Sequence, residues 1–163
     1  MGQSFTLGQL PVSRIAAIVF AVFAAAAVPA LAAPAYDAAA VARIHAAIVD
    51  CPGCNLAGAD LTNTCVKAHD LHGANFDGAT AVLMCMSYAN FTNATFRGTD
   101  LSGANLAHAT VDGADFSGAV MDITSIKGTD LTKAKGLTQH QFDQACGDAG
   151  TRAPAGLKVH ICT

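Results

Sequence analysis

The 163-residue sequence contains no tryptophan and no glutamate, and only 6% of its residues are aromatic. The missing glutamate is informative because aspartate, the one acidic residue present, hydrogen-bonds its own backbone in turns and disfavours helix. The sequence therefore favours a chain made of turns over a helical protein. Its net charge of −3 at pH 7 gives no basic surplus, and we predict no nucleic-acid partner.

The sequence also lacks the short motifs that identify common enzyme classes. It has no GxSxG, P-loop, dinucleotide-binding or HExxH pattern, and glycines such as Gly73 and Gly78 do not form a phosphate loop. The six histidines are dispersed along the chain and do not follow metal-ligand spacing. We therefore predict a protein that is not an enzyme, with no catalytic residue, no metal site and no cofactor.

What the sequence does contain is a strict period of five. Steps of five from Leu56 to Leu131 meet a large apolar residue at every position except Ala81. The residue before each such centre is often Asp or Asn, a small residue stands two before it, and Gly is frequent two after it. This period matches neither the helical 3.6 nor the plain-strand 2, so it indicates a repeat architecture.

Residues 59–63 and 104–108, which read ADLTN and ANLAH, are typical units. Such units resemble the pentapeptide-repeat proteins, and the resemblance covers residues 54–133. It implies an all-β solenoid, a right-handed quadrilateral β-helix in which four fives make one coil, here about four coils. The implied period of twenty is present, because Gly stands two residues after each member of one expected core stack. The members of that stack are Leu56, Phe76, Phe96 and Phe116.

One segment departs from the repeat pattern. Residues 81–86 have the small Ala81 at a centre, Leu83 where Gly is common, and Met84 where Ala is expected. We predict a bulged corner or a local register slip in this part of the second coil.

The segments that flank the repeat are suited to covering its open ends. Residues 33–53 combine an amphipathic helical pattern over 37–49 with a Cys-Pro-Gly-Cys lead-in to the repeat. In residues 134–163, the capping box at Thr138 predicts the start of a helix. This helix is expected to stop at Gly147, and a disulfide-tied tail follows it. Together these segments predict short α-helical caps at both ends of the solenoid.

The N-terminal segment has the layout of a secretory signal peptide. Arg14 precedes an apolar run over 15–28, and small residues follow, so that cleavage is predicted after Ala32 or, as a second choice, Ala35. The alternative is an uncleaved anchor, because the apolar stretch approaches the roughly 20 residues that span a bilayer. We predict a signal peptide over residues 1–32, a periplasmic or secreted bacterial protein, and no stable membrane insertion after cleavage.

Six cysteines in an exported chain of this size indicate disulfides. In the coil that the resemblance implies, Cys65 and Cys85 lie one above the other, and a spacing of about 4.8 Å falls within the Cα window for a disulfide. By proximity and exclusion, the remaining predicted pairs are Cys146–Cys162 and Cys51–Cys54. The alternative for the last pair is a redox-active CxxC, because that spacing favours thiol exchange.

Some surface residues become neighbours in the implied coil. Tyr88 lies one coil below His108, and His69 and His72 share the edge of one coil. We interpret these as ordinary neighbours on a solvated wall.

These features favour a non-catalytic, exported structural or protein-interaction module whose protein partner and binding wall stay open. A homodimer joined end to end is compatible with so short a solenoid. One alternative is a DNA-mimic inhibitor, because some pentapeptide-repeat proteins resemble B-form DNA in outline and charge and occupy a topoisomerase. The other is a thiol or redox protein that depends on Cys51 and Cys54.

Overall fold

The computed structural model of the protein describes residues 36–47 and 50–162, and Pro34–Thr163 form one compact unit. The predicted signal peptide, residues 1–32, lies outside the described residues. Among the residues that are described, no helix is long and apolar enough to cross a membrane.

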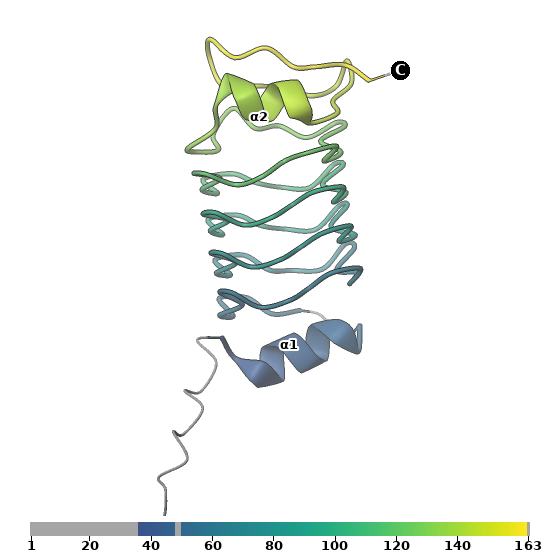
Figure 1. The fold of residues 1–163 in the computed structure, drawn as a ribbon, viewed down its shortest axis with the longest axis vertical. Helices are drawn as coiled ribbons and strands as arrows, with labels where there is room; N and C mark the ends of the chain where they lie inside the picture. Colours follow the sequence, from purple (N-terminus) through teal and green to yellow (C-terminus); the bar gives the residue numbers. More distant parts are fainter. Residues whose placement is uncertain (1–35, 48–49, 163) are drawn as a thin grey trace, which may run out of the picture. The chain divides into compact units, whose positions relative to one another are not determined.

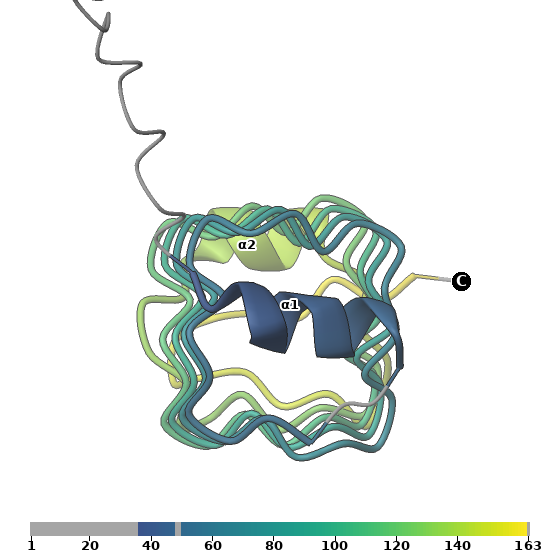
Figure 2. The same cartoon turned by 90° about the horizontal axis from the view of Figure 1, so that it is seen from below.

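The chain winds into a stack of square coils between two short helices, α1 (Ala38–His45) and α2 (Gln139–Gln144) (Figures 1 and 2). Parallel bridges join residues that are twenty apart, beginning with Asn55 and Asn75. Backbone hydrogen bonds follow the same rule, since the N–H of Leu56 donates to the Asn75 carbonyl at 2.7 Å and equivalent bonds continue up the column. Each coil therefore takes four fives.

The coil is held by isolated bridges and not by extended strands. A turn in every five residues leaves no room for the five or six consecutive extended residues of an ordinary strand. The β character of the fold therefore lies in single paired residues, repeated from coil to coil.

We call the four sides of the square walls and number them in chain order. The first wall consists of residues 54–58, 74–78, 94–98 and 114–118, and the second of residues 59–63, 79–83, 99–103 and 119–123. The third wall consists of residues 64–68, 84–88, 104–108 and 124–128. The fourth wall consists of residues 50–53, 69–73, 89–93, 109–113 and 129–133.

The apolar positions of the repeat fill the inside of the column. The expected core stack of Leu56, Phe76, Phe96 and Phe116 is fully buried. The ring of Phe96 stacks on those of Phe76 and Phe116, with centroids 4.8 and 5.0 Å apart and interplanar angles of 16° and 8°. Phe91 of the fourth wall meets the Phe96 ring edge-on at 5.3 Å. Burial of each such side chain is worth about 1.5–3 kcal/mol, so this stack contributes strongly to stability.

Each corner of the square depends on two kinds of turn residue. An Asp or Asn before the centre accepts a hydrogen bond from the backbone N–H two residues on, as Asp60 does from Thr62 at 3.0 Å. The residue two after the centre adopts a left-handed conformation, which glycine does at no steric cost. Leu83, Tyr88 and Ile123 adopt it too, with φ of 57°, 61° and 57°, at a cost of about 1–2 kcal/mol each.

The predicted bulge or register slip at residues 81–86 is wrong. The bridges at Thr80 and Cys85 keep the twenty-residue spacing to their partners in the next coil. Ala81 and Met84 are both fully buried at neighbouring inward positions, where a long, flexible methionine suits the space beside a small centre. The five-residue register therefore continues through this segment, with a small residue at the centre and a large one at the next inward position.

The coil begins one unit earlier than the sequence predicts. The N–H of Cys51 donates to the Asp70 carbonyl at 2.9 Å, and Cys51 is buried at a centre position. The Cys-Pro-Gly-Cys lead-in is therefore the first turn of the coil itself. A search for large apolar centres misses this turn because cysteine is small.

The C-terminal segment adds a partial coil where the sequence predicts only a disulfide-tied tail after the helix. Ser125 bridges to Cys146 and Asp130 to Arg152, so the spacing lengthens from 20 residues to 21 and then to 22. The first extra residue falls in the side that contains α2, because a helix rises only about 1.5 Å per residue and needs more residues to cover one side. The second falls after the helix, between Cys146 and Arg152.

Helix α1 lies at one end of the coil stack (Figure 1). The Asp37 carboxylate caps it by accepting from the N–H groups of Ala39 and Ala40, and Ile44 is buried in the core. The N–H of Asp37 also donates to the Asn55 carbonyl at 2.8 Å, which fixes the helix to the first coil.

Helix α2 lies at the other end and has the predicted capping box of Thr138 and Gln141. The buried Gln141 side chain also donates to the carbonyls of Phe116 and Ala119 at 2.9 and 3.0 Å. The helix ends at Gln144 and does not reach Gly147. It stops early because the next residues are extended and pair with the coil below.

Candidate functional site

Two of the predicted site cysteines are joined. Cys146 and Cys162 form a disulfide with an S–S distance of 2.11 Å, and their Cα atoms are 5.3 Å apart. The bond closes the C-terminal segment onto the residues that follow α2.

The other two predicted disulfides are not formed in the structure, where Cys51, Cys54, Cys65 and Cys85 are free thiols. Cys65 and Cys85 form a parallel bridge, and burial, followed by the interaction with the Cys65 thiol, raises the pKa of Cys85. Parallel side chains about 4.8 Å apart keep their Cβ atoms at a similar separation, beyond the roughly 3.5–4.5 Å that a disulfide requires. Closing the bond would require the two side chains to tilt toward each other, so this pairing stays a prediction.

Cys51 and Cys54 occupy two inward positions of the first turn, where the N–H of Cys54 donates to the Cys51 carbonyl at 3.3 Å. Burial, and then the hydrogen bond with the Cys51 thiol, raise the pKa of Cys54 to about 12. A reactive thiol needs the opposite shift, because the thiolate is the nucleophile. Cys51 is also buried, which limits the access that thiol exchange requires, so this turn does not favour the redox interpretation of the CxxC.

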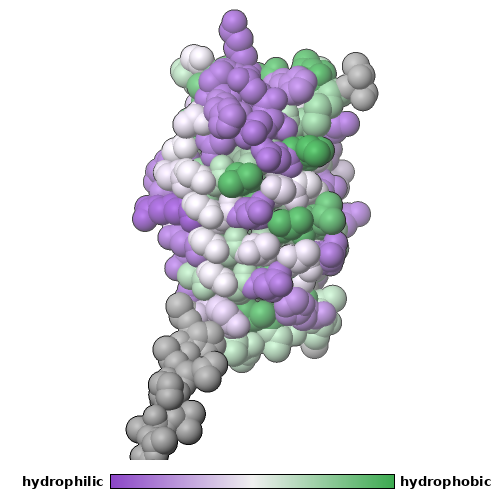
Figure 3. All heavy atoms as spheres, viewed as in Figure 1, coloured by the Kyte–Doolittle hydropathy of each residue, from purple (hydrophilic) through white to green (hydrophobic). Residues whose placement is uncertain are grey.

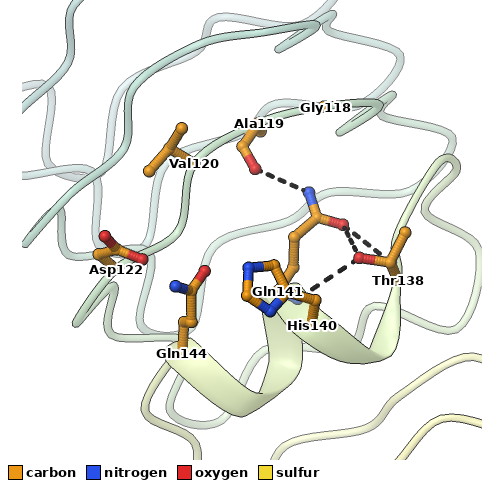
Figure 4. A pocket seen from close by; sticks show the side chains of 8 residues that line it. All are labelled: Gly118, Ala119, Val120, Asp122, Thr138, His140, Gln141 and Gln144. Atoms are coloured by element: carbon orange, nitrogen blue, oxygen red, sulfur yellow. Dashed lines mark hydrogen bonds between the residues drawn. The ribbon is translucent and has the colours of Figure 1, made fainter.

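A shallow pocket of about 330 Å³ lies beside α2 (Figure 4). Gln141 lines it, but its amide is already bonded to the Ala119 carbonyl and to Thr138. Asp122, His140 and Gln144 border the rest of the hollow. These three side chains belong to an open surface, which offers polar contacts and not an enclosed reaction site.

Metal-ligating side chains are dispersed over the described part of the chain. Among residues 36–47 and 50–162, no three His, Cys or Asp side chains could hold a metal ion together. His69 bonds to Asp50 at 3.2 Å and His72 to Asp70 at 3.1 Å, so each lies beside an exposed carboxylate of the fourth wall.

The walls differ in charge. Three Arg or Lys ion pairs and two His–Asp contacts occur in the described residues, and all five use an aspartate of the first or fourth wall, as in Arg97–Asp115 at 2.7 Å. The second wall has three aspartates and no Lys or Arg. The third wall has the reverse, since it contains Lys67 and Lys127 and no aspartate. The third wall is therefore basic, whereas the other three walls contain more aspartate than lysine and arginine.

The third wall also has an exposed aromatic stack. The rings of Tyr88 and His108 are 4.9 Å apart with an interplanar angle of 17°, and the Lys67 ammonium lies 5.9 Å from the centre of the Tyr88 ring. His108 in turn covers Gly128, where an added Cβ would overlap its ring. The sequence predicted the Tyr88–His108 proximity, although not the stack.

Large exposed hydrophobic side chains are concentrated on two adjacent walls. Leu83, Val120 and Ile123 belong to the second wall and Tyr88 to the third, and Ile123 is 76% exposed. Figure 3 shows strongly hydrophobic side chains among polar ones on the visible face of the column. This cluster was not predicted from the sequence. It could have been found from the large residues that stand at corners of these two walls, where glycine is frequent.

Comparisons with known proteins give a consistent result. A family model described as pentapeptide repeats, in eight copies, matches residues 49–81, 85–122 and 99–135. A pentapeptide-repeat protein of the Arabidopsis thaliana thylakoid lumen is 30% identical, with 60% of this chain and 77% of that chain covered and a TM-score of 0.29. One from Nostoc PCC 7120 is 25% identical, with 74% and 88% covered and a TM-score of 0.38.

A further solved structure is that of QnrB1, a plasmid-mediated fluoroquinolone resistance protein. It is 19% identical, with 66% of this chain and 58% of that chain covered and a TM-score of 0.27. A search of curated proteins found no match to the chain.

Proposed function

The chain belongs to the pentapeptide-repeat family, and from this premise we propose that it is a non-catalytic module that binds a protein partner through its walls. The observation that carries this proposal is the gathering of Leu83, Tyr88, Val120 and Ile123 on two adjacent walls. Exposed hydrophobic side chains that cluster on one side of a soluble protein mark interaction surfaces. In the proposed arrangement the coil is a right-handed quadrilateral β-helix, and α1 and α2 act as its caps.

We further propose that the protein acts after export to the periplasm or beyond the cell, without stable membrane insertion. The Cys146–Cys162 disulfide supports this location, because such bonds persist in oxidising compartments. A reporter fused to residues 1–35 should be exported, and its retention in the cytoplasm would contradict the proposal. Thiol titration of the exported protein would also show whether Cys65 and Cys85 become oxidised.

Neither alternative function gains support from the walls. A DNA mimic would present negative charge around its circumference, whereas the third wall has Lys67, Lys127 and no aspartate. A redox role would need an accessible thiolate, whereas Cys51 is buried and the pKa of Cys54 is raised. An end-to-end homodimer stays a prediction, and it would have to form through surfaces that α1 and the C-terminal segment now occupy.

The test places a photo-crosslinking residue on each wall of the full chain in its own cell. Suitable positions, one for each wall in order, are Ser117, Ser102, Ala107 and Thr132. We expect adducts of one defined mass from the second or third wall and none from the first or fourth. The absence of protein adducts from every wall would contradict a protein-binding function.

A further inference from the structure

We propose that the third wall, with the bordering corner residues Leu83 and Ile123, binds an extended acidic segment of a protein partner that places an apolar or aromatic side chain against Tyr88. This inference rests on the proposed function and names the wall and the chemistry of the partner.

The first argument is conformational. Four first-wall corners, at residues 58, 78, 98 and 118, are glycine, whereas Leu83, Tyr88 and Ile123 adopt the same left-handed conformation with large side chains. For a β-branched residue such as Ile123 this conformation is a genuine outlier. These side chains are 57%, 57% and 76% exposed, so packing in the free protein offsets only part of the strain. Retained strain of this kind is characteristic of binding sites.

The second argument is charge. Lys67 and Lys127 are both exposed, and neither forms an ion pair within the described part of the chain. They are three coils apart, which is about 14 Å at 4.8 Å per coil. Because the other walls are rich in aspartate, an acidic partner would be attracted to the third wall and repelled by its neighbours.

The third argument is the shape of the surface between the two lysines. Tyr88 and His108 present parallel, stacked rings there, and Lys67 lies beside the Tyr88 ring. Tyrosine is among the residues that contribute most to protein interfaces, and its ring is held in place here before binding. At about 3.3 Å per residue, an extended segment of roughly four residues spans the distance between the lysines. Such a segment can carry an acidic residue near each end and an apolar residue over Tyr88.

The test uses a fluorescein-labelled peptide of sequence Glu-Asp-Ala-Phe-Ala-Asp-Glu and the purified exported protein at low salt. We expect saturable binding by fluorescence anisotropy, weakened at least tenfold in 0.2 M salt and absent for a peptide with Lys at the acidic positions. Tyr88→Gly should weaken binding at least tenfold, and glycine suits the left-handed backbone, so this variant should fold. Lys67→Gln combined with Lys127→Gln should weaken it similarly. Lys133→Gln, on the fourth wall, is the matched control and should leave binding unchanged.

The proposal is overturned if the wild-type protein does not bind the acidic peptide, or if the third-wall variants bind it as well as the wild type does. Tighter binding to alginate or single-stranded DNA than to the peptide would also overturn it, because the partner would then not be a protein. Self-association that Tyr88→Gly abolishes, without peptide binding, would identify a second copy as the occupant. A partner that crosslinks at Ser102 but not at Ala107 would refute this inference while leaving the proposed function intact.

Discussion

Gly98 and Gly128 allow the cost of a left-handed corner to be separated from the contribution of the aromatic stack. Both are corner glycines, with φ of +61° and +64°. A Cβ at Gly98 would have no atom within 4 Å, whereas a Cβ at Gly128 would overlap the imidazole of His108. Gly98→Ala and Gly128→Ala therefore both place an alanine in the left-handed conformation, and only Gly128→Ala must also displace the His108 ring.

The shared cost is backbone strain. A left-handed alanine costs about 1–2 kcal/mol, and about 0.5–1 kcal/mol of this is offset because glycine loses more entropy on folding. Gly98→Ala should therefore lower the free energy of unfolding by about 1 kcal/mol. Gly128→Ala must also move the His108 ring, which loses a Tyr88 stack worth about 0.5–1.5 kcal/mol, so its total should be about 2 kcal/mol.

Urea unfolding followed by circular dichroism measures both changes. In a His108→Ala background, Gly128→Ala should cost no more than Gly98→Ala, because no ring remains to be moved. Equal costs for the two glycine substitutions in the wild-type background would refute the reasoning. Gly128→Ala should also weaken binding of the acidic peptide, whereas Gly98→Ala should not.

Three further predictions concern the core, the disulfide and a surface carboxylate. Phe96→Ala should lower the free energy of unfolding by about 3–5 kcal/mol and Phe96→Leu by much less, as measured by urea unfolding, since Phe96 packs between two stacked rings. Cys162→Ser should cost about 3 kcal/mol by the loop-entropy estimate for a separation of 16 residues and should expose the C-terminal segment to proteolysis, and unchanged resistance would contradict this. Hydrogen bonds from Ser117, and then from Arg97, lower the pKa of Asp115 to about 2, below its unfolded value of about 3.9. The resulting stability is present above pH 4 and is lost as the pH falls through about 2, so Asp115→Asn should remove this part of the decline in urea midpoint between pH 4 and pH 2.

The coil could be predicted from the sequence because large apolar residues recur every five positions, and their size and apolarity are enough to place them in the core. The stack of Leu56, Phe76, Phe96 and Phe116 follows from a spacing of twenty, and the capping box at Thr138 follows from local chemistry. The predicted bulge at residues 81–86 is wrong because a small centre was taken to break the register, whereas Ala81 and Met84 are both buried and the twenty-residue bridges continue.

The candidate surface was harder to predict, because its evidence lies in conformation and in orientation across coils. Sequence spacing places Tyr88 below His108, but it does not show that the rings are parallel or that Leu83 and Ile123 are strained and exposed. The C-terminal pairing of Ser125 with Cys146 was also beyond the sequence. The spacing between these two residues depends on how many residues the side of the square that contains α2 requires.

The twenty-residue coil has a consequence for how such a chain tolerates insertions and deletions. Removing twenty residues would shorten the column by one coil and leave every remaining side chain on its own wall. Removing five would preserve the inward apolar centres but turn everything beyond the cut by a quarter of a revolution. A five-residue deletion between Tyr88 and His108 would then leave a folded column whose two rings lie on different walls. The fold therefore tolerates length changes in multiples of five, whereas the third-wall surface tolerates them only in multiples of twenty.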